Sequence, residues 1–146
     1  PDAVSSASKA GRTIPYSGDV AYLNLYLLTP KGAYLYQPDK SALKQVSAKD
    51  ERAAITSEFI KTSPFMILYV ADTAKAPSFL KGNKAMLREM MNADAGFAAE
   101  NVGLVASSLK LGSIIMYNIK PADAAGLLGM GKEEIPLFVM QFGYTQ

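Results

Sequence analysis

Hydrophobic and polar residues alternate in short blocks along the first part of the chain. Between residues 20 and 29, leucine occupies every second position from Leu23 to Leu27. Such alternation is typical of a half-buried strand. Turn residues follow, and the same pattern resumes at 33–37 and 43–46. The pattern predicts a β-meander at the start of the domain.

The next segment changes from alternating to helical spacing. Ser47, with Asp50 three residues later, predicts a helix N-cap and a helix over 48–60. The continuously apolar run 65–71 predicts a strand that is covered on both faces. Residues 72–82 contain proline and glycine and predict a loop.

A long helix is predicted from an Asn83 cap to about residue 110, with a stop at Gly112. Its large apolar residues fall on one side of a helical wheel, and these are Leu87, Met90, Met91, Phe97, Val102, Val105 and Leu109, with Ala98 among them. The opposite side carries small residues, which are Gly96, Ala99, Gly103 and Ala106. Both sides therefore need a cover, and we expect a second copy of the chain to cover the side lined by glycine and alanine.

The last third continues with a strand, a helix and a strand. Residues 113–117 and 137–142 are apolar runs that predict two buried strands. Between them, Pro121 suits the first turn of a short helix through residue 128, and Gly129 closes it.

Length and charge limit the possible classes. The 146 residues predict one domain over 12–146, preceded by a small, polar and flexible arm at 1–11. A net charge of +2 gives no reason to expect nucleic acid or membrane partners, and no apolar run approaches the ~20 residues of a membrane helix. We expect a cytoplasmic protein.

Cysteine and histidine are both absent from the chain. Their absence excludes disulfides, thiol nucleophiles, Ser-His-Asp triads and Cys/His metal sites. We therefore expect no metal site and no catalytic side chain. An enzyme of this composition would take its reactivity from a cofactor.

The order of landmarks between Asp94 and Tyr144 resembles the nitroreductase family of flavin enzymes, and most closely its SagB-type dehydrogenase branch. Three segments carry this resemblance, namely Asp-Ala-Gly-Phe-Ala-Ala-Glu-Asn at 94–101, Leu-Gly-Ser-Ile-Ile-Met at 111–116 and the final apolar strand. The resemblance implies an α+β fold, in which helices pack on a mixed, mainly antiparallel sheet and a long central helix lies at a dimer interface. It also implies that the chain lacks the family's N-terminal helices.

The resemblance implies two cofactor-binding segments. The first is the loop from Arg12 to Asp19, which is similar to the family's Arg-Thr-x-Pro-Ser-Ala-x-Asn loop, and Arg12 would suit the FMN phosphate. The second follows the Leu-Gly-Ser segment, where backbone N–H groups face the flavin ring. The implied cofactor-binding residues are Arg12, Pro15, Tyr16, Ser17, Asp19, Ile115, Met116, Tyr117 and Asn118. Asp94 and Asn101 would brace the flavin-side loops from within the helix.

Two hypotheses about function follow from the resemblance. The first is an FMN-dependent oxidoreductase that passes hydride from NAD(P)H through the flavin to a small-molecule acceptor, or a SagB-like dehydrogenase. The second is a flavin-poor or flavin-free dimeric binding module. The chain departs from the family pattern at Tyr16, Asp19, Ala21 and Asn118, and these departures favour the second hypothesis.

Overall fold

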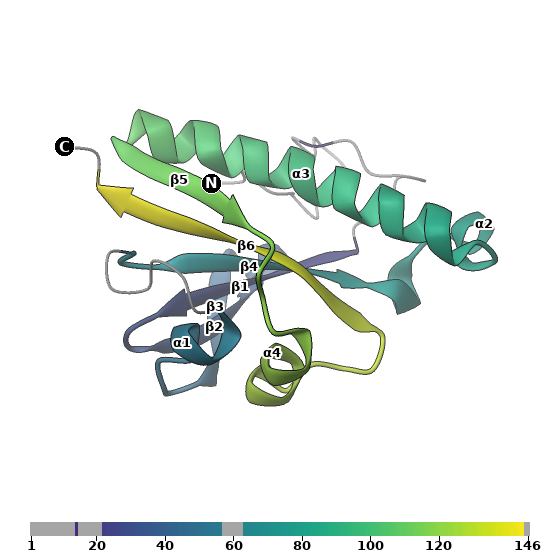
Figure 1. The fold of residues 1–146 in the computed structure, drawn as a ribbon, viewed down its shortest axis with the longest axis horizontal. Helices are drawn as coiled ribbons and strands as arrows, with labels where there is room; N and C mark the ends of the chain where they lie inside the picture. Colours follow the sequence, from purple (N-terminus) through teal and green to yellow (C-terminus); the bar gives the residue numbers. More distant parts are fainter. Residues whose placement is uncertain (1–13, 15–21, 57–62, 145–146) are drawn as a thin grey trace.

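A six-stranded antiparallel sheet forms the centre of the protein, in the order β3-β2-β1-β4-β6-β5 (Figure 1). The computed structural model describes residues 14, 22–56 and 63–144. The strands are β1 (Leu23–Thr29), β2 (Gly32–Gln37), β3 (Ala42–Ser47), β4 (Met66–Asp72), β5 (Leu111–Met116) and β6 (Glu134–Tyr144). The α+β fold class and its mainly antiparallel sheet are confirmed.

Strands β1 to β3 form the predicted meander. The turn between β1 and β2 ends at Gly32, whose φ of +146° is rarely adopted by other residues. A Cβ at this position would lie 2.5 Å from the backbone oxygen of Ser47 on β3. Glycine is therefore required both by the turn and by the close approach of the third strand.

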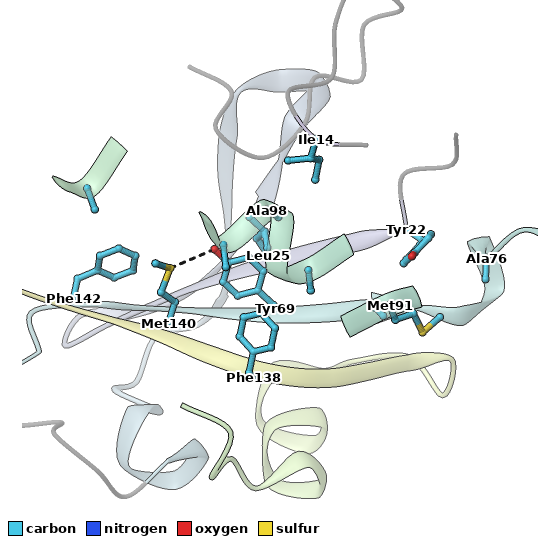
Figure 2. Close-up of a cluster of buried hydrophobic side chains, with 14 residues drawn as sticks. Ile14, Tyr22, Leu25, Tyr69, Ala76, Met91, Ala98, Phe138, Met140 and Phe142 are labelled. Carbon is cyan, nitrogen blue, oxygen red and sulfur yellow. Dashed lines mark hydrogen bonds between the residues drawn. The ribbon is translucent and has the colours of Figure 1, made fainter. Parts of the chain in front are cut away.

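Strand β4 lies between β1 and β6 and is buried on both faces, as its apolar run predicts. Met66, Leu68 and Val70 belong to the core cluster on one face. Tyr69 and Ala71 belong to the cluster on the other face, where the Tyr69 ring stacks on Phe138 at 4.8 Å between centroids (Figure 2).

Helices cover the two faces unequally. The long helix α3 (Lys84–Ser108) runs across one face, and the short helices α1 (Arg52–Ile55) and α4 (Pro121–Leu128) lie on the other (Figure 1). The predicted N-cap of α3 and the predicted C-cap of α4 are confirmed. The Asn83 side chain accepts a hydrogen bond from the Met86 backbone N–H at 3.1 Å, and Gly129 closes α4 in the left-handed conformation.

The prediction of a helix from Ala48 with Ser47 as its N-cap is wrong. Ser47 is the last residue of β3, and its hydroxyl donates to the Glu51 carboxylate at 2.7 Å. Helix α1 begins only at Arg52 and ends before Thr56, which is extended and forms a bridge with Ile119. The predicted end of this helix falls at 57–60, outside the described residues.

The loop predicted at 72–82 contains two short helices, η3 (Thr73–Lys75) and α2 (Ser78–Lys81). The stop predicted at Gly112 is also displaced. Lys110 takes the left-handed conformation, with φ of 59°, and β5 begins at Leu111. The end of α3 itself lies within two residues of the predicted position.

The assignment of the two sides of α3 needs correction. Ala99 and Ala106 are buried within this chain, and a Cβ on Gly103 would contact Met140 of β6 and Ser113 of β5. Ala99, Gly103 and Ala106 therefore face the chain's own sheet and do not require a second subunit, whereas a Cβ on Gly96 would meet nothing within 4 Å. Several large apolar residues that were predicted to be covered are exposed instead, namely Phe97, Val105 and Leu109.

Strand β5 is the last strand of the described sheet, whereas its sequence predicted a buried strand. Ile114 and Ile115 are 51% and 37% exposed. β6 fits the prediction better, because Phe138, Val139 and Met140 are all buried. It also extends beyond the predicted range at both ends.

The arm predicted at 1–11 lies outside the described residues, so this prediction stands untested. None of the helices in the described ranges is long and apolar enough to cross a bilayer.

Candidate functional site

The candidate site is the end of β5 and the two residues after it. Pairing between β5 and β6 continues to Met116, which lies opposite Val139. Beyond it, Tyr117 and Asn118 are exposed, and the Tyr117 ring tilts at 60° against Phe138 with 5.5 Å between centroids. Four of the predicted cofactor-binding residues, Ile115 to Asn118, therefore lie on one accessible segment.

This segment is held at both ends. On one side, the β5–β6 ladder fixes Ile115 and Met116. On the other side, Ile119 bridges Thr56, and the Lys120 backbone N–H donates to the Ile55 carbonyl at 2.8 Å. A backbone fixed at two points keeps its peptide groups in place without a bound ligand. The segment is thus suited to recognition through the backbone.

The other predicted cofactor-binding residues lie outside the described residues, and these are Arg12, Pro15, Tyr16, Ser17 and Asp19. The residues that flank 15–21 are described. Ile14 and Tyr22 are 3% and 0% exposed, and both belong to the core cluster beneath α3 (Figure 2).

A buried polar pair lies within this cluster. Asp94 is 3% exposed, and the Tyr22 hydroxyl donates a hydrogen bond to its carboxylate. The sequence predicted Asp94 as a bracing residue within the long helix, and burial of a carboxylate demands a partner. It did not identify Tyr22, which is 72 residues away in the chain.

A second carboxylate cluster, which the sequence analysis missed, lies at the start of β6. Glu134 accepts hydrogen bonds from Asn24 at 2.7 Å, from the Tyr26 hydroxyl at 3.2 Å and from the Gly131 backbone N–H at 2.7 Å. Burial, reinforced by the charge of Glu134, raises the pKa of Tyr26 well above its usual range. These bonds join β1 to the turn before β6.

Arg52 is buried, but its guanidinium is already engaged by protein groups. It donates to both carboxylate oxygens of Asp50 at 2.8 Å and to the Ser63 carbonyl. The hydrogen bonds from Arg52 lower the pKa of Asp50. Arg52 therefore holds the chain around α1 and is a poor candidate for binding an anion.

A hollow of about 360 Å³ lies near the other end of β5, lined by Ser63, Gly112–Ile114 and Gln141–Tyr144. Gly112 and Gly143 are paired across the two strands, so this one pair adds no side chain to the hollow. Among the residues that the structure describes, no group of three or more Asp, Glu, Cys or His could hold a metal ion.

An antiparallel sheet with a long helix on one face and short helices on the other defines an α+β architecture. A family model matches residues 1–144, and the chain belongs to the nitroreductase family. Members of this family generally use FMN, and the fold is consistent with a flavin oxidoreductase.

Solved structures share this fold. A putative nitroreductase from Ralstonia eutropha JMP134 is 24% identical, with a TM-score of 0.83, and the match covers 99% of this chain and 69% of that one. The E. coli microcin synthetase McbBCD complex with truncated pro-MccB17 bound includes a chain that is 20% identical, with a TM-score of 0.80. The match covers 99% of this chain and 60% of that one.

The NADPH:FMN oxidoreductase from Vibrio harveyi complexed with NAD+ is 17% identical, with a TM-score of 0.65, and the match covers 92% of this chain and 55% of that one. The chain thus spans little more than half to about two thirds of these structures. No curated protein matches it.

Proposed function

We propose that the chain is an FMN-dependent oxidoreductase that acts as a homodimer and transfers hydride from NAD(P)H to a small-molecule acceptor. Membership of the nitroreductase family carries the proposal. The Vibrio harveyi structure, an NADPH:FMN oxidoreductase, supports the choice of cofactor and donor. The cytoplasmic location expected from the sequence stays a prediction.

The accessible segment Ile115 to Asn118 fits a flavin ring. It combines exposed apolar side chains, from Ile115 and Tyr117, with backbone groups on a strand at the edge of the described sheet. Apolar contact with a few well-placed hydrogen-bond donors is the usual character of cofactor sites. In this proposal, backbone N–H groups of the segment hold the ring, and Arg12 holds the phosphate.

When bound, FMN supplies the hydride chemistry, which the side chains of this chain lack. The chain's own part is to orient the ring, exclude water and hold the phosphate charge. Rigid attachment of the segment to β6 and α1 serves the first of these tasks.

The homodimer is proposed from the exposed side of α3. Phe97, Leu104 and Val105 in its second half and Leu109 at its C-cap are 48–66% exposed. Large apolar residues gathered on one element in this way mark interaction surfaces. We define these four residues as the outer apolar surface of α3. A second copy would cover it and bring two candidate sites into one assembly.

A second candidate function is suggested by the microcin synthetase complex, whose fold matches over 99% of this chain. That complex contains a bound precursor peptide. In this reading the chain is a SagB-like dehydrogenase that oxidises a peptide-derived heterocycle, with the same cofactor segments. A comparison of nitroaromatic and heterocycle-containing peptide substrates, under matched conditions, distinguishes the two.

Titration with FMN tests the proposal. The wild-type chain should quench the fluorescence of added FMN and bind it at a defined stoichiometry. Arg12→Ala should weaken binding about tenfold or more, because a charge-assisted bond to phosphate contributes about 1.5–3 kcal/mol. Arg88→Ala, at an exposed arginine of α3, is the control and should bind FMN as the wild type does.

One result would contradict the proposal, and another would contradict only the role of Arg12. A wild-type chain that neither carries nor takes up FMN favours the flavin-free binding module, to which Tyr16, Asp19, Ala21 and Asn118 point. Equal FMN affinity in wild type and Arg12→Ala removes Arg12 from the site while leaving the cofactor in place.

A further inference from the structure

Helix α1 is too short to be stable on its own. It comprises only the four residues Arg52–Ile55, and no side chain caps its N-terminus. An isolated helix of this length does not persist in water, so contacts with the rest of the protein must hold α1 in place. Ile55 supplies one of them, because it is fully buried in the core cluster that also contains Ala124 and Leu128 of α4.

Arg52 supplies the polar contacts of this helix. Its buried side chain donates to both carboxylate oxygens of Asp50 and to the Ser63 carbonyl. The Ser63 hydroxyl in turn donates to the Phe65 carbonyl at 2.7 Å and accepts from the Phe142 backbone N–H at 3.3 Å. Since Phe142 belongs to β6, Arg52 connects α1 to that strand through Ser63.

The C-terminal end of α1 holds the candidate site. The Ile55 carbonyl accepts a hydrogen bond from the Lys120 backbone N–H at 2.8 Å, and Thr56 bridges Ile119. These contacts fix one end of the segment Ile115 to Asn118, and the β5–β6 ladder fixes the other. Both ends of the segment are thus attached to β6, one through β5 and the other through α1.

We infer that Arg52 is a positioning residue for the candidate site, an inference that rests on the proposed function. Its guanidinium is engaged by Asp50 and Ser63, so it acts on the segment through α1. While α1 stays docked, the Ile55 carbonyl remains within reach of the Lys120 N–H. A segment that is already ordered loses less conformational freedom when a ligand binds, and release of α1 should therefore weaken FMN binding.

Two substitutions weaken the attachment of α1 to different extents. Arg52→Met keeps an unbranched apolar stem and removes every donor, whereas Asp50→Asn keeps an oxygen that can still accept from Arg52. The Asp50 side chain is 37% exposed, so water can solvate what the second substitution leaves unpaired. Tyr26→Phe is the control. It removes a hydroxyl that donates to Glu134, in the same core cluster as Ile55 but at the start of β6.

The experiment measures amide hydrogen exchange by NMR without FMN, FMN affinity by fluorescence titration, and melting temperature. Arg52→Met should accelerate exchange of the Lys120 amide about tenfold or more, because α1 loses bonds made by a charged group. Exchange across the β5–β6 ladder should stay close to that of the wild type. FMN affinity should fall about fivefold or more. Asp50→Asn should produce smaller changes in the same direction.

Tyr26→Phe should lower the melting temperature and leave both Lys120 exchange and FMN affinity unchanged. Unchanged Lys120 exchange in Arg52→Met would overturn the inference, as would unchanged affinity when the wild type binds FMN. Equal acceleration across the ladder, or an equal loss of affinity in Tyr26→Phe, would overturn it too. Should Arg52→Met fail to fold, the same criteria apply to Asp50→Asn.

Failure of the proposed function has a different signature. A wild-type chain that binds no FMN refutes that function. Selective acceleration at Lys120 in Arg52→Met would then still support the positioning of the segment by Arg52.

Discussion

The two sides of α3 carry different sizes of side chain. The side that faces the sheet is built mainly from alanine, and Ala95, Ala98 and Ala99 are each 0% exposed. The outer apolar surface carries Phe97, Leu104, Val105 and Leu109. Leu109 is the most exposed of the four, at 66%. Small residues let a helix approach a sheet closely. Side-chain size therefore contributes, beside hydrophobicity, to which side is packed within the chain, although the large Met91 is buried on this side too.

The largest effect is expected on the outer side. Leu104→Glu should convert the proposed dimer into monomers, because each dimer loses two buried leucines at about 1.5–3 kcal/mol each. The dissociation constant should therefore rise by about two orders of magnitude or more. Sedimentation equilibrium measures this change.

Leu43→Glu is the matched control, since Leu43 is a leucine of β3 with 50% exposure at the opposite edge of the sheet. It should leave the dimer intact. A wild-type chain that sediments as a monomer would refute the dimer, and equal dissociation by both variants would refute the assignment of its surface.

An intermediate effect is expected on the inner side. Ala99→Leu should lower the free energy of unfolding by about 1–3 kcal/mol, because added methylene groups in a packed core force neighbours to move. Urea denaturation measures this change. Ala93→Leu, at an exposed position of α3, should stay within about 0.5 kcal/mol of wild type. Similar values for the two variants would mean that the inner side is loosely packed.

The smallest effect is a pH dependence from Tyr69, in the core beneath α3. Burial raises the pKa of Tyr69 above its usual range, so the folded state keeps a proton that the unfolded state releases above pH ~10. This contribution to stability is complete below pH ~10 and is lost as the pH rises further, by at most ~1.4 kcal/mol per pH unit.

Tyr69→Phe removes the titrating group and should flatten the stability curve between about pH 9 and 11. Denaturant unfolding over this range, compared with wild type, measures the difference. Parallel curves for the two proteins would indicate that the cluster beneath α3 admits water.

Local signals in the sequence were sufficient for most elements. Asn83 and Gly129 mark helix ends through bonds and conformations that involve only a few neighbouring residues. Ser47 misled the prediction because its hydroxyl bonds to Glu51 in a turn after β3. A helix cap and a turn use the same side chain, and only the structure separates them.

Long-range features could not be predicted in the same way. The apolar run of β5 resembles a buried strand, but sheet order places it at the edge. The wheel of α3 predicted one covered side for all its large apolar residues. Met91 is buried there, and Leu87 and Val102 pack against the cluster. Phe97, Val105 and Leu109 are exposed instead, because hydrophobicity alone does not report how closely a helix lies on a sheet. At the candidate site, the consecutive segment Ile115 to Asn118 could be proposed from the sequence. The pairing of Tyr22 with Asp94 could not, because it forms only through tertiary contact.

Strand β5 has a further consequence for handling the protein. It presents apolar side chains at Ile114 and Ile115, and it pairs with β6 on one edge while no other described strand adjoins the opposite edge. An apolar edge strand is a template on which further chains can add and grow into aggregates. Yield and shelf life of the purified protein should therefore depend on whatever shields this strand during expression and storage.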